Sequence, residues 1–169
     1  KEGCAEGDCG ACTVVVAERN ASDVVGGLKY RAVNSCILPM VTLDGRQLIT
    51  VEDLAEPGPN GEAVLHPVQQ AMVEHHGSQC GFCTPGFIMS MFAMTHQPGG
   101  DEAGQSRLAI NEALAGNLCR CTGYVPIVRA SRQALAADSP DRFGRDERLT
   151  VERLQALPPR ECLRQSKGG

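Results

Sequence analysis

Eight of the nine cysteines in this chain of 169 residues fall into two groups of four. The first group has the spacing C-x4-C-x2-C with a fourth member further along, and the second consists of a C-x2-C pair and a later C-x-C pair. A [2Fe–2S] cluster takes four thiolates, because its two irons share two sulfides and each still needs two ligands. The sequence therefore predicts two such clusters, held by Cys4, Cys9, Cys12 and Cys36, and by Cys80, Cys83, Cys119 and Cys121.

Glycines stand beside the cysteines of the first group, at Gly3, Gly7 and Gly10. The C-x4-C-x2-C spacing is the one found in plant-type ferredoxins. Glycine adopts backbone conformations with positive φ at little cost, so a loop rich in glycine can wrap closely around a cluster. Such a loop can point its amide N–H groups at the cluster sulfurs, which stabilises an added electron. We therefore expect a plant-type cluster loop at the start of the chain.

Disulfides, thioredoxin-like redox pairs and zinc sites also use clustered cysteines. An odd number of thiols and no visible signal peptide argue against disulfides, which need an oxidising compartment. The pairs at 9–12 and 80–83 resemble C-x-x-C redox motifs, and a C-x-x-C with a later C-x-C also suits a structural zinc site. Redox pairs leave the other four thiols unexplained, and structural zinc usually occupies short knuckles. Cys162, in a polar tail beside two prolines, is expected to be a bystander.

The composition limits the compartment and the partners. The formal net charge is −4 and Lys and Arg form no cluster, which argues against a nucleic-acid surface because phosphate binding needs such clusters. There is no apolar run of about 18 residues and no signal peptide, so we expect no membrane span and a cytoplasmic location. Because Lys1 already belongs to the cysteine loop, we also expect that the true N-terminus lies upstream.

The residues around the first group predict a β-rich unit. The three expected strands are 13–17, 30–35 and 47–50. A hairpin turn is expected at 43–46, and residues 50–53 resemble a capping box that opens a short helix. A linker rich in Pro and Gly follows at 56–61. We therefore expect a first domain at 1–60, whose sheet also needs strands from upstream of the chain.

The second half of the chain predicts helices in a repeated order: a helix, a cysteine pair, a threonine and a second helix. Two such hairpins packed about a pseudo-twofold axis would bring the cysteine pairs together, with each pair supplying the thiolates of one iron. Helix starts beside them would favour an anionic cluster. The result is a four-helix second domain at 61–137. Its helices are expected from Pro67 to Gly77, from an N-cap at Thr84 with apolar residues nearly all round, at 108–115 after a break at 99–104, and from Pro126 to Ala137.

The end of the chain and the histidines carry weaker signals. Residues 138–169 are polar and are expected to form a tether, with one short capped helix at 150–157. His75, His76 and His96 could suggest metal binding or catalysis, but no carboxylate motif accompanies them. We expect them at the surface or at helix ends.

Four motifs of the chain together resemble one known family. They are Cys4-Ala-Glu-Gly-Asp-Cys-Gly-Ala-Cys12, His66-Pro-Val-Gln-Gln-Ala-Met72, Gly77-Ser-Gln-Cys-Gly-Phe-Cys-Thr-Pro-Gly86 and Asn117-Leu-Cys-Arg-Cys-Thr-Gly-Tyr124. They are similar to the iron–sulfur part of the molybdenum hydroxylases, over roughly residues 1 to 137. The resemblance implies an α+β chain with a β-grasp ferredoxin domain, a helical [2Fe–2S] domain, and a linker toward a flavin domain.

The resemblance also implies further cofactors and partners. Molybdopterin and FAD would lie on other domains or subunits of an assembled oligomer, in which the molybdenum site hydroxylates a purine and electrons reach FAD and then NAD. Gln79 would contact the pterin, and Cys121 would lie close to it. The implied electron order is molybdenum, the second cysteine group, the first group, and FAD. The alternatives are an aldehyde- or CO-oxidising enzyme, a free-standing ferredoxin-type carrier and a zinc-bound interaction module.

Overall fold

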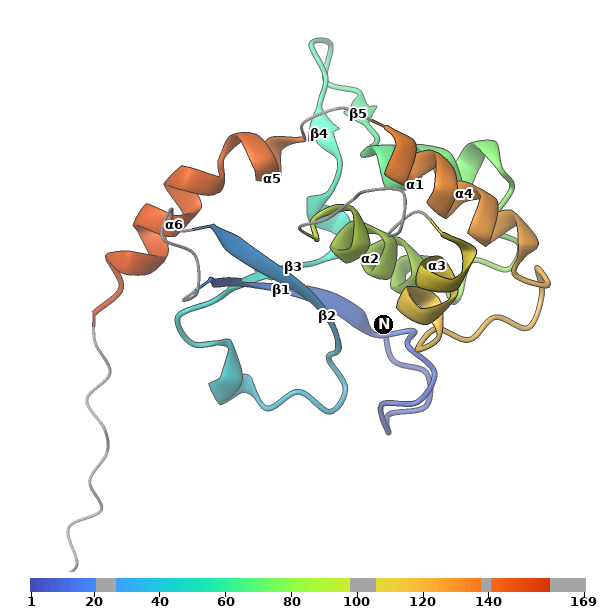
Figure 1. Cartoon of the computed structure of the whole chain (residues 1–169), viewed down its shortest axis with the longest axis horizontal. Coiled ribbons are helices and arrows are strands. Elements are labelled where there is room, and N and C mark those ends of the chain that lie inside the picture. Colours follow the sequence, from blue (N-terminus) through green and yellow to red (C-terminus); the bar gives the residue numbers. More distant parts are fainter. Residues whose placement is uncertain (21–26, 98–105, 138–140, 159–169) are drawn as a thin grey trace, which may run out of the picture.

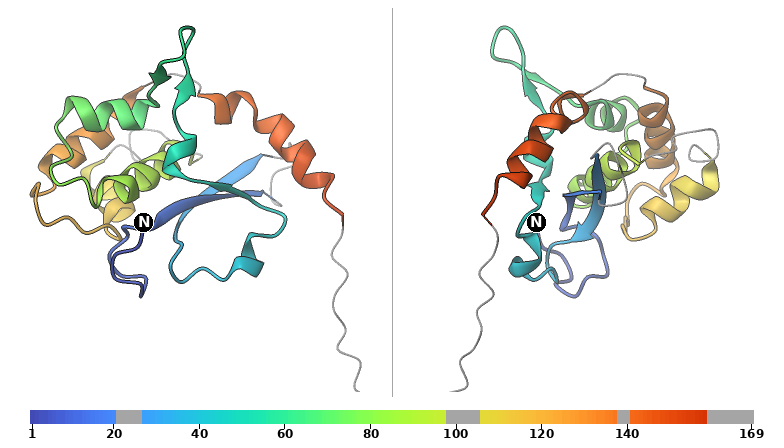
Figure 2. Two further views of the ribbon diagram at one scale, coloured as in Figure 1. Left: turned by 180° about the vertical axis from the view of Figure 1, so that it is seen from behind. Right: turned by 60° about the vertical axis from the view of Figure 1, so that its left-hand side comes forward.

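The computed structural model describes residues 1–20, 27–97, 106–137 and 141–158. A small sheet lies beside a group of helices (Figure 1), and Figure 2 shows that the last helix runs outward from the fold. This mixture confirms the α+β class. None of the described helices is long and apolar enough to cross a membrane. The break expected at 99–104 and the predicted bystander Cys162 lie outside the described residues.

The main sheet has the strand order β2-β1-β3 within the described residues. The central strand β1 (Thr13–Arg19) pairs antiparallel with β2 (Leu28–Asn34) along its full length and with β3 (Gln47–Ile49) on its other side. The β-branched residues of β1 and β3 suit this position, because side chains such as Val15 and Ile49 are fully buried against the helices. All three predicted strands are confirmed, and β2 begins slightly earlier than predicted.

Two local predictions in this half differ from the structure. The turn at 43–46 does not join two strands, because a single 3-10 turn, Met40–Leu43, precedes β3. The helix expected after Thr50 is only another 3-10 turn, Val51–Asp53, and the Thr50 side chain does not cap it. Neither 3-10 turn has a buried residue, and segments this short do not form a stable α-helix without packing against the core.

The segment expected to be an open linker forms a small hairpin instead. Its strands β4 (Glu56–Pro57) and β5 (Ala63–Val64) pair antiparallel. Gly61, with φ of 84°, closes the turn, and its amide donates to the carbonyl of Gly58 at 3.0 Å. The chain therefore passes from the sheet to the helices along a hydrogen-bonded path.

The helices of the second half are arranged around α2 (Thr84–Thr95). The helices α1 (Pro67–Glu74), α3 (Arg107–Leu114) and α4 (Val125–Ala136) all contact α2, which also packs against β1. The side chains of α2 are buried from residue 86 to residue 93, as its nearly uniform apolar sequence predicts. The four predicted helices are thus present, although Cys83 rather than the threonine after it holds the N-cap position of α2.

One core runs through both halves of the chain. Ile49 of the sheet belongs to the same buried cluster as Phe92 of α2. The backbones approach closely at Gly86, where a Cβ atom would overlap the carbonyl oxygen of Gly10. Only glycine therefore lets α2 lie against the N-terminal loop. The core crosses the domain boundary that was expected near residue 60.

Part of the segment expected to be a tether, residues 141–157, is folded onto the rest of the chain. It contains α5 (Arg142–Arg145) and α6 (Glu147–Gln155), and α6 begins before residue 150, where the short helix was expected to start. Phe143 explains the docking, because its ring is buried with its centroid 4.8 Å from that of Phe92.

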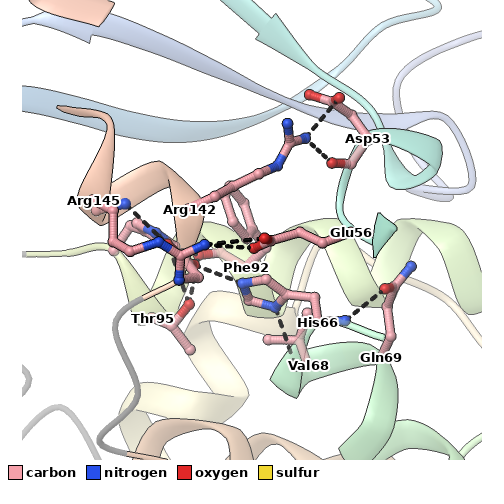
Figure 3. A network of polar contacts seen from close by, with 12 residues as sticks. Asp53, Glu56, His66, Val68, Gln69, Phe92, Thr95, Arg142 and Arg145 are labelled. Atoms are coloured by element: carbon pink, nitrogen blue, oxygen red, sulfur yellow. Dashed lines mark hydrogen bonds and ion pairs between the residues drawn. The ribbon is translucent and has the colours of Figure 1, made fainter. Parts of the chain in front are cut away.

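A buried carboxylate shared by two histidines anchors α5. Figure 3 labels one of these histidines, His66, together with Arg142 and Arg145 of α5. Asp141, the N-cap of α5, accepts hydrogen bonds from Nε2 of His66 at 2.6 Å and of His96 at 3.0 Å. Nδ1 of His66 accepts from the amide of Val68, so His66 donates through Nε2 alone. Nδ1 of His96 lies 3.0 Å from the carbonyl oxygen of Phe92, which can only accept.

His96 lies at the end of α2, one of the two positions expected for the histidines. The network adds what was not expected, because only 12% of the His96 side chain is exposed and it has a carboxylate partner. The partner was not visible in the sequence because Asp141 lies 45 residues further along. Burial by itself raises the pKa of Asp141, but the hydrogen bonds from His66 and His96 outweigh it and hold this pKa well below its usual range.

Asp141→Asn keeps the side-chain shape but removes the charge that the two histidines face. We expect the free energy of unfolding to fall by about 2 kcal/mol at neutral pH, the usual contribution of hydrogen bonds to a charged group. Because the folded pKa is depressed, the stabilising effect of Asp141 is fully present above the unfolded pKa of about 3.9 and is lost as the pH falls below it. Urea unfolding at several pH values measures both effects.

The matched control is Asp146→Asn, the same exchange at an exposed carboxylate of the same segment. It should change the free energy of unfolding by less than about 0.5 kcal/mol. Equal losses in the two variants would contradict the role assigned to Asp141.

Candidate metal centres

The first cysteine group lies in a tightly wound loop at the start of the chain. Positive φ values of 59°, 79° and 69° occur at Ala5, Gly7 and Gly10. The loop therefore curls back on Cys4, and the amide of Cys9 lies 3.3 Å from the Cys4 sulfur. The amide of Glu6 in the first place, and those of Cys9 and Asp8, lower the pKa of Cys4 to about 7 because they stabilise the thiolate. The predicted direction of amide groups toward sulfur is confirmed at Cys4.

The end of β2 fixes Cys36 against this loop. The Asn34 side chain donates to the carbonyl of Gly7 at 2.6 Å, and the Ser35 hydroxyl donates to the carbonyl of Cys12 at 2.8 Å. The thiols of Cys12 and Cys36 share a hydrogen bond, which raises the pKa of Cys36. Burial raises the pKa of Cys12, but that bond and its other donors outweigh burial and lower it overall. The fourth cysteine, distant in sequence, thus joins the other three.

The second cysteine group is built from two loops that face each other. Cys80 and Cys83 lie at the start of α2, and Cys119 and Cys121 lie between α3 and α4. The sulfurs of Cys80 and Cys121 are 3.6 Å apart, and the thiols of Cys83 and Cys119 are hydrogen-bonded to each other. Each of these contacts joins one loop to the other.

The distance between the sulfurs of Cys80 and Cys121 fits two thiolates on one tetrahedral metal. With metal–sulfur bonds of about 2.3 Å, two such sulfurs lie about 3.8 Å apart. The expectation that each pair in the sequence serves one iron therefore differs from the structure, because the nearest thiols belong to opposite loops. In the described part of the chain, no group of three or more His, Cys, Asp or Glu side chains is arranged to hold a single metal ion.

Local donors give the four sulfurs of the second group different environments. Burial first, and then the bond to Cys119, raise the pKa of Cys83 to about 12. Burial also raises the pKa of Cys119, but the Thr122 hydroxyl, 3.2 Å from its sulfur, helps to lower it overall. A backbone amide lowers the pKa of Cys80, and the contact with Cys80 raises that of Cys121. One thiol of each contact pair is therefore the easier to deprotonate.

One edge of the second group is open. Cys80 and Cys121 are exposed, whereas Cys83 and Cys119 are half-buried. Gln79, which the family resemblance singles out, is also exposed and directly precedes Cys80. The structure therefore brings Gln79 next to the open pair of thiols.

Asn117 is a candidate that the sequence alone did not identify. It is only 4% exposed, and its Nδ2 donates to the carbonyl of Gly10 in the first loop at 3.1 Å. The amide of Leu118 donates to the carbonyl of Cys9 at 3.0 Å. In the sequence, Asn117 stands directly after Gly116 and opens the motif at 117–124 that resembles the family, but no role was assigned to it there.

The cysteine groups and the helices around them agree with a known domain family. Residues 50–132 match the family described as [2Fe-2S] binding domain. With two groups of four thiols on an α+β scaffold, the chain is an iron–sulfur protein. The solved structure of quinoline 2-oxidoreductase from Pseudomonas putida 86 is 31% identical with a TM-score of 0.62, and the match covers 86% of this chain and 74% of that chain. The chain belongs to the molybdenum hydroxylase family and corresponds to the iron–sulfur component of these oxidoreductases.

Two curated relatives have names that refer to different substrates. Xanthine dehydrogenase from Blastobotrys adeninivorans is 49% identical over 131 residues, which cover 78% of this chain and 9% of that protein. Aldehyde oxidase 1 from Rattus norvegicus is 42% identical over 135 residues, which also cover 78% of this chain and 9% of that protein. The chain therefore spans about a tenth of the length of these relatives.

Proposed function

We propose that this chain carries electrons through two [2Fe–2S] clusters, from a molybdopterin site toward FAD and NAD in a larger enzyme. The first cysteine group would hold one cluster in a ferredoxin-like β-grasp domain at 1–60, and the second group would hold the other in a helical domain at 61–137. The chain after residue 138 would lead toward the flavin domain. The observation that supports this proposal best is the 3.6 Å contact between Cys80 and Cys121, which fits shared ligation of one metal.

A bound [2Fe–2S] cluster takes up and releases single electrons, and the chain holds it and stabilises the added charge. The amide groups around Cys4 and the positive end of α2 beside Cys83 both favour an anionic group. In the second site, we expect Cys80 and Cys121 to bind one iron and Cys83 and Cys119 to bind the other. Because each iron then joins both loops, the cluster would fasten the loops to each other.

The open edge of the second group is the proposed contact with molybdopterin. Gln79 and Cys121 are both exposed there. A glutamine amide carries two donors and an acceptor, which suits the polar edge of a pterin, and the Cys121 sulfur would provide the first ligand along the electron path. Electrons would then pass from the second group to the first group and on to FAD.

The proposed substrate of the assembled enzyme is a purine, because the identity to a xanthine dehydrogenase exceeds that to an aldehyde oxidase, 49% against 42%. An aldehyde is the second candidate, which the latter relative supports. Either substrate would react on another domain, so assays of the assembled enzyme with a purine and with an aldehyde would decide between them.

The purified chain is expected to contain about four irons and four acid-labile sulfides, because each of the two clusters holds two irons and two sulfides. Its visible absorbance should bleach on reduction, because sulfide-to-iron charge transfer gives an oxidised cluster its colour. Iron, zinc and sulfide analysis measures the content directly. Zinc near stoichiometry without sulfide would contradict the proposal.

Gln79→Ala in the assembled enzyme is expected to slow the reduction of the clusters by substrate roughly tenfold, the effect of one lost hydrogen bond. Its pterin content should also fall, because the amide no longer reaches the pterin. Pterin analysis and rapid mixing with substrate measure the two effects. Gln97→Ala, at an exposed glutamine beyond the opposite end of α2, should change neither. The role is wrong if Gln79→Ala behaves like this control.

Cys36→Ser tests the order of the two clusters. A serine alkoxide is a harder ligand than a thiolate, so the first cluster should be weakened or shifted while the second is unaffected. Substrate should still reduce the molybdenum site and the second cluster, but the electrons should then stall before the flavin. Rapid-freeze spectroscopy of the assembled variant during reduction by substrate follows each centre. Normal flavin reduction without a first cluster would mean that the order is reversed or that the two clusters act in parallel.

A further inference from the structure

We propose that Asn117 is a positioning residue for electron transfer between the two cysteine groups. Its side chain would hold the first cysteine loop against the loop that carries Cys119, and so keep a main-chain hydrogen bond between the groups short. This inference rests on the function proposed above, and it assigns a role to a residue that binds no metal.

The link between the groups is the hydrogen bond from the Leu118 amide to the Cys9 carbonyl, 3.0 Å long. Leu118 directly precedes Cys119 of the second group, and Cys9 belongs to the first. Covalent bonds interrupted by this one hydrogen bond therefore join a thiol of one group to a thiol of the other. One electron passing from the second group to the first oxidises one site and reduces the other, and no bond forms or breaks.

The amide of Asn117 is engaged at both ends. Its Nδ2 donates to the carbonyl of Gly10 at 3.1 Å and to the hydroxyl of Thr13 at 3.2 Å. Its Oδ1 accepts from the hydroxyl of Ser90 at 2.6 Å. Because a carbonyl can only accept, the contact with Gly10 fixes the orientation of the amide. Asn117 and Ser90 are 4% and 5% exposed, so water cannot easily replace these bonds.

Backbone segments near Asn117 approach so closely that there is no room for a side chain at Gly10 or Gly86. A Cβ atom at Gly10 would overlap the carbonyl oxygen of Gly116, and a Cβ atom at Gly86 would overlap that of Gly10. The glycines have no side chains that could form hydrogen bonds here, so the Asn117 amide supplies the side-chain hydrogen bond to the Gly10 carbonyl. Without the Nδ2 donors of Asn117, no side chain at position 117 holds the Gly10 carbonyl of the first loop. The neighbouring hydrogen bond between Leu118 and Cys9 should then open more often.

A positioning role differs from simple packing in what it changes. Packing alone would alter stability and cluster content, whereas positioning alters the rate of transfer between clusters that are both present. Asn117→Asp keeps the shape and the Ser90 contact but removes both Nδ2 donors. In the assembled enzyme it should retain both clusters, speed hydrogen exchange at the Leu118 amide roughly tenfold, and slow transfer between the groups by a similar factor. This is the effect expected from losing the bond to the Gly10 carbonyl, since the Thr13 hydroxyl can still donate to a carboxylate.

Rapid-freeze spectroscopy after mixing with substrate follows the reduction of each cluster in turn. A redox titration of each cluster separates a changed potential from a changed path, which matters because the variant adds a carboxyl group. Asn111→Asp makes the same exchange at an exposed position of α3 and should leave hydrogen exchange and transfer unchanged. Equal transfer rates in Asn117→Asp and Asn111→Asp, with clusters and potentials intact, would overturn the proposal.

Ser90→Ala keeps the test decisive if Asn117→Asp loads its clusters poorly. This variant adds no charge and releases only Oδ1 of Asn117, so it should slow transfer in the same direction but to a smaller extent. Unchanged exchange at Leu118 together with unchanged transfer in Ser90→Ala would then overturn the role of Asn117. A wild-type protein without iron and sulfide would instead overturn the proposed function itself.

Discussion

The carbonyl group of Gly10 is the point at which the two halves of the fold are joined. It accepts hydrogen bonds from the amide of Thr13 at 3.1 Å, from the hydroxyl of Thr13 at 2.7 Å and from Asn117 at 3.1 Å. A buried carbonyl without partners costs free energy, and here its partners come from both halves of the chain. Because β1 begins at Thr13 and α2 lies against the same carbonyl at Gly86, the shared core follows from this junction.

The two cysteine groups meet the same electrostatic demand with different local structures. The first group relies on a loop with positive φ that turns amide groups toward Cys4. The second relies on two loops at helix ends, with Cys83 at the N-cap of α2 and a half-buried inner pair behind an exposed outer pair. A loop that donates many amides can wrap a cluster from one side, whereas two facing loops leave an edge open. The fold thus holds the first cysteine group in a loop that surrounds it and the second group between two loops that leave Cys80 and Cys121 exposed.

The sequence predicted those features that local patterns determine. The spacing of the thiols, the β-branched run of β1 and the uniformly apolar α2 each act within a few residues, and the structure agrees with them. Most contacts between distant residues were missed, because packing and not local propensity decides them. The thiols of each group were expected to come together, but the sequence did not show which of them lie closest. In the sequence, Asn117 is 107 residues from Gly10, Asp141 is 75 residues from His66, and Cys121 is 41 residues from Cys80. The crosswise pairing of thiols illustrates this, since the repeat in the sequence suggested pairs within each loop.

The C-terminal helices connect the same two halves at a second place, at the start of α5. Arg142 pairs with Asp53 at 2.7 Å and Arg145 pairs with Glu56 at 3.0 Å, both in the first half of the chain. The Arg145 pair is largely exposed and contributes at most about 1 kcal/mol, so the buried Asp141 network on the second half dominates. Any motion that separated the halves at α5 would have to break these contacts together with the ties at Gly10. The spacing of the cysteine groups and the position of α5 on the fold are therefore held by one connected set of interactions.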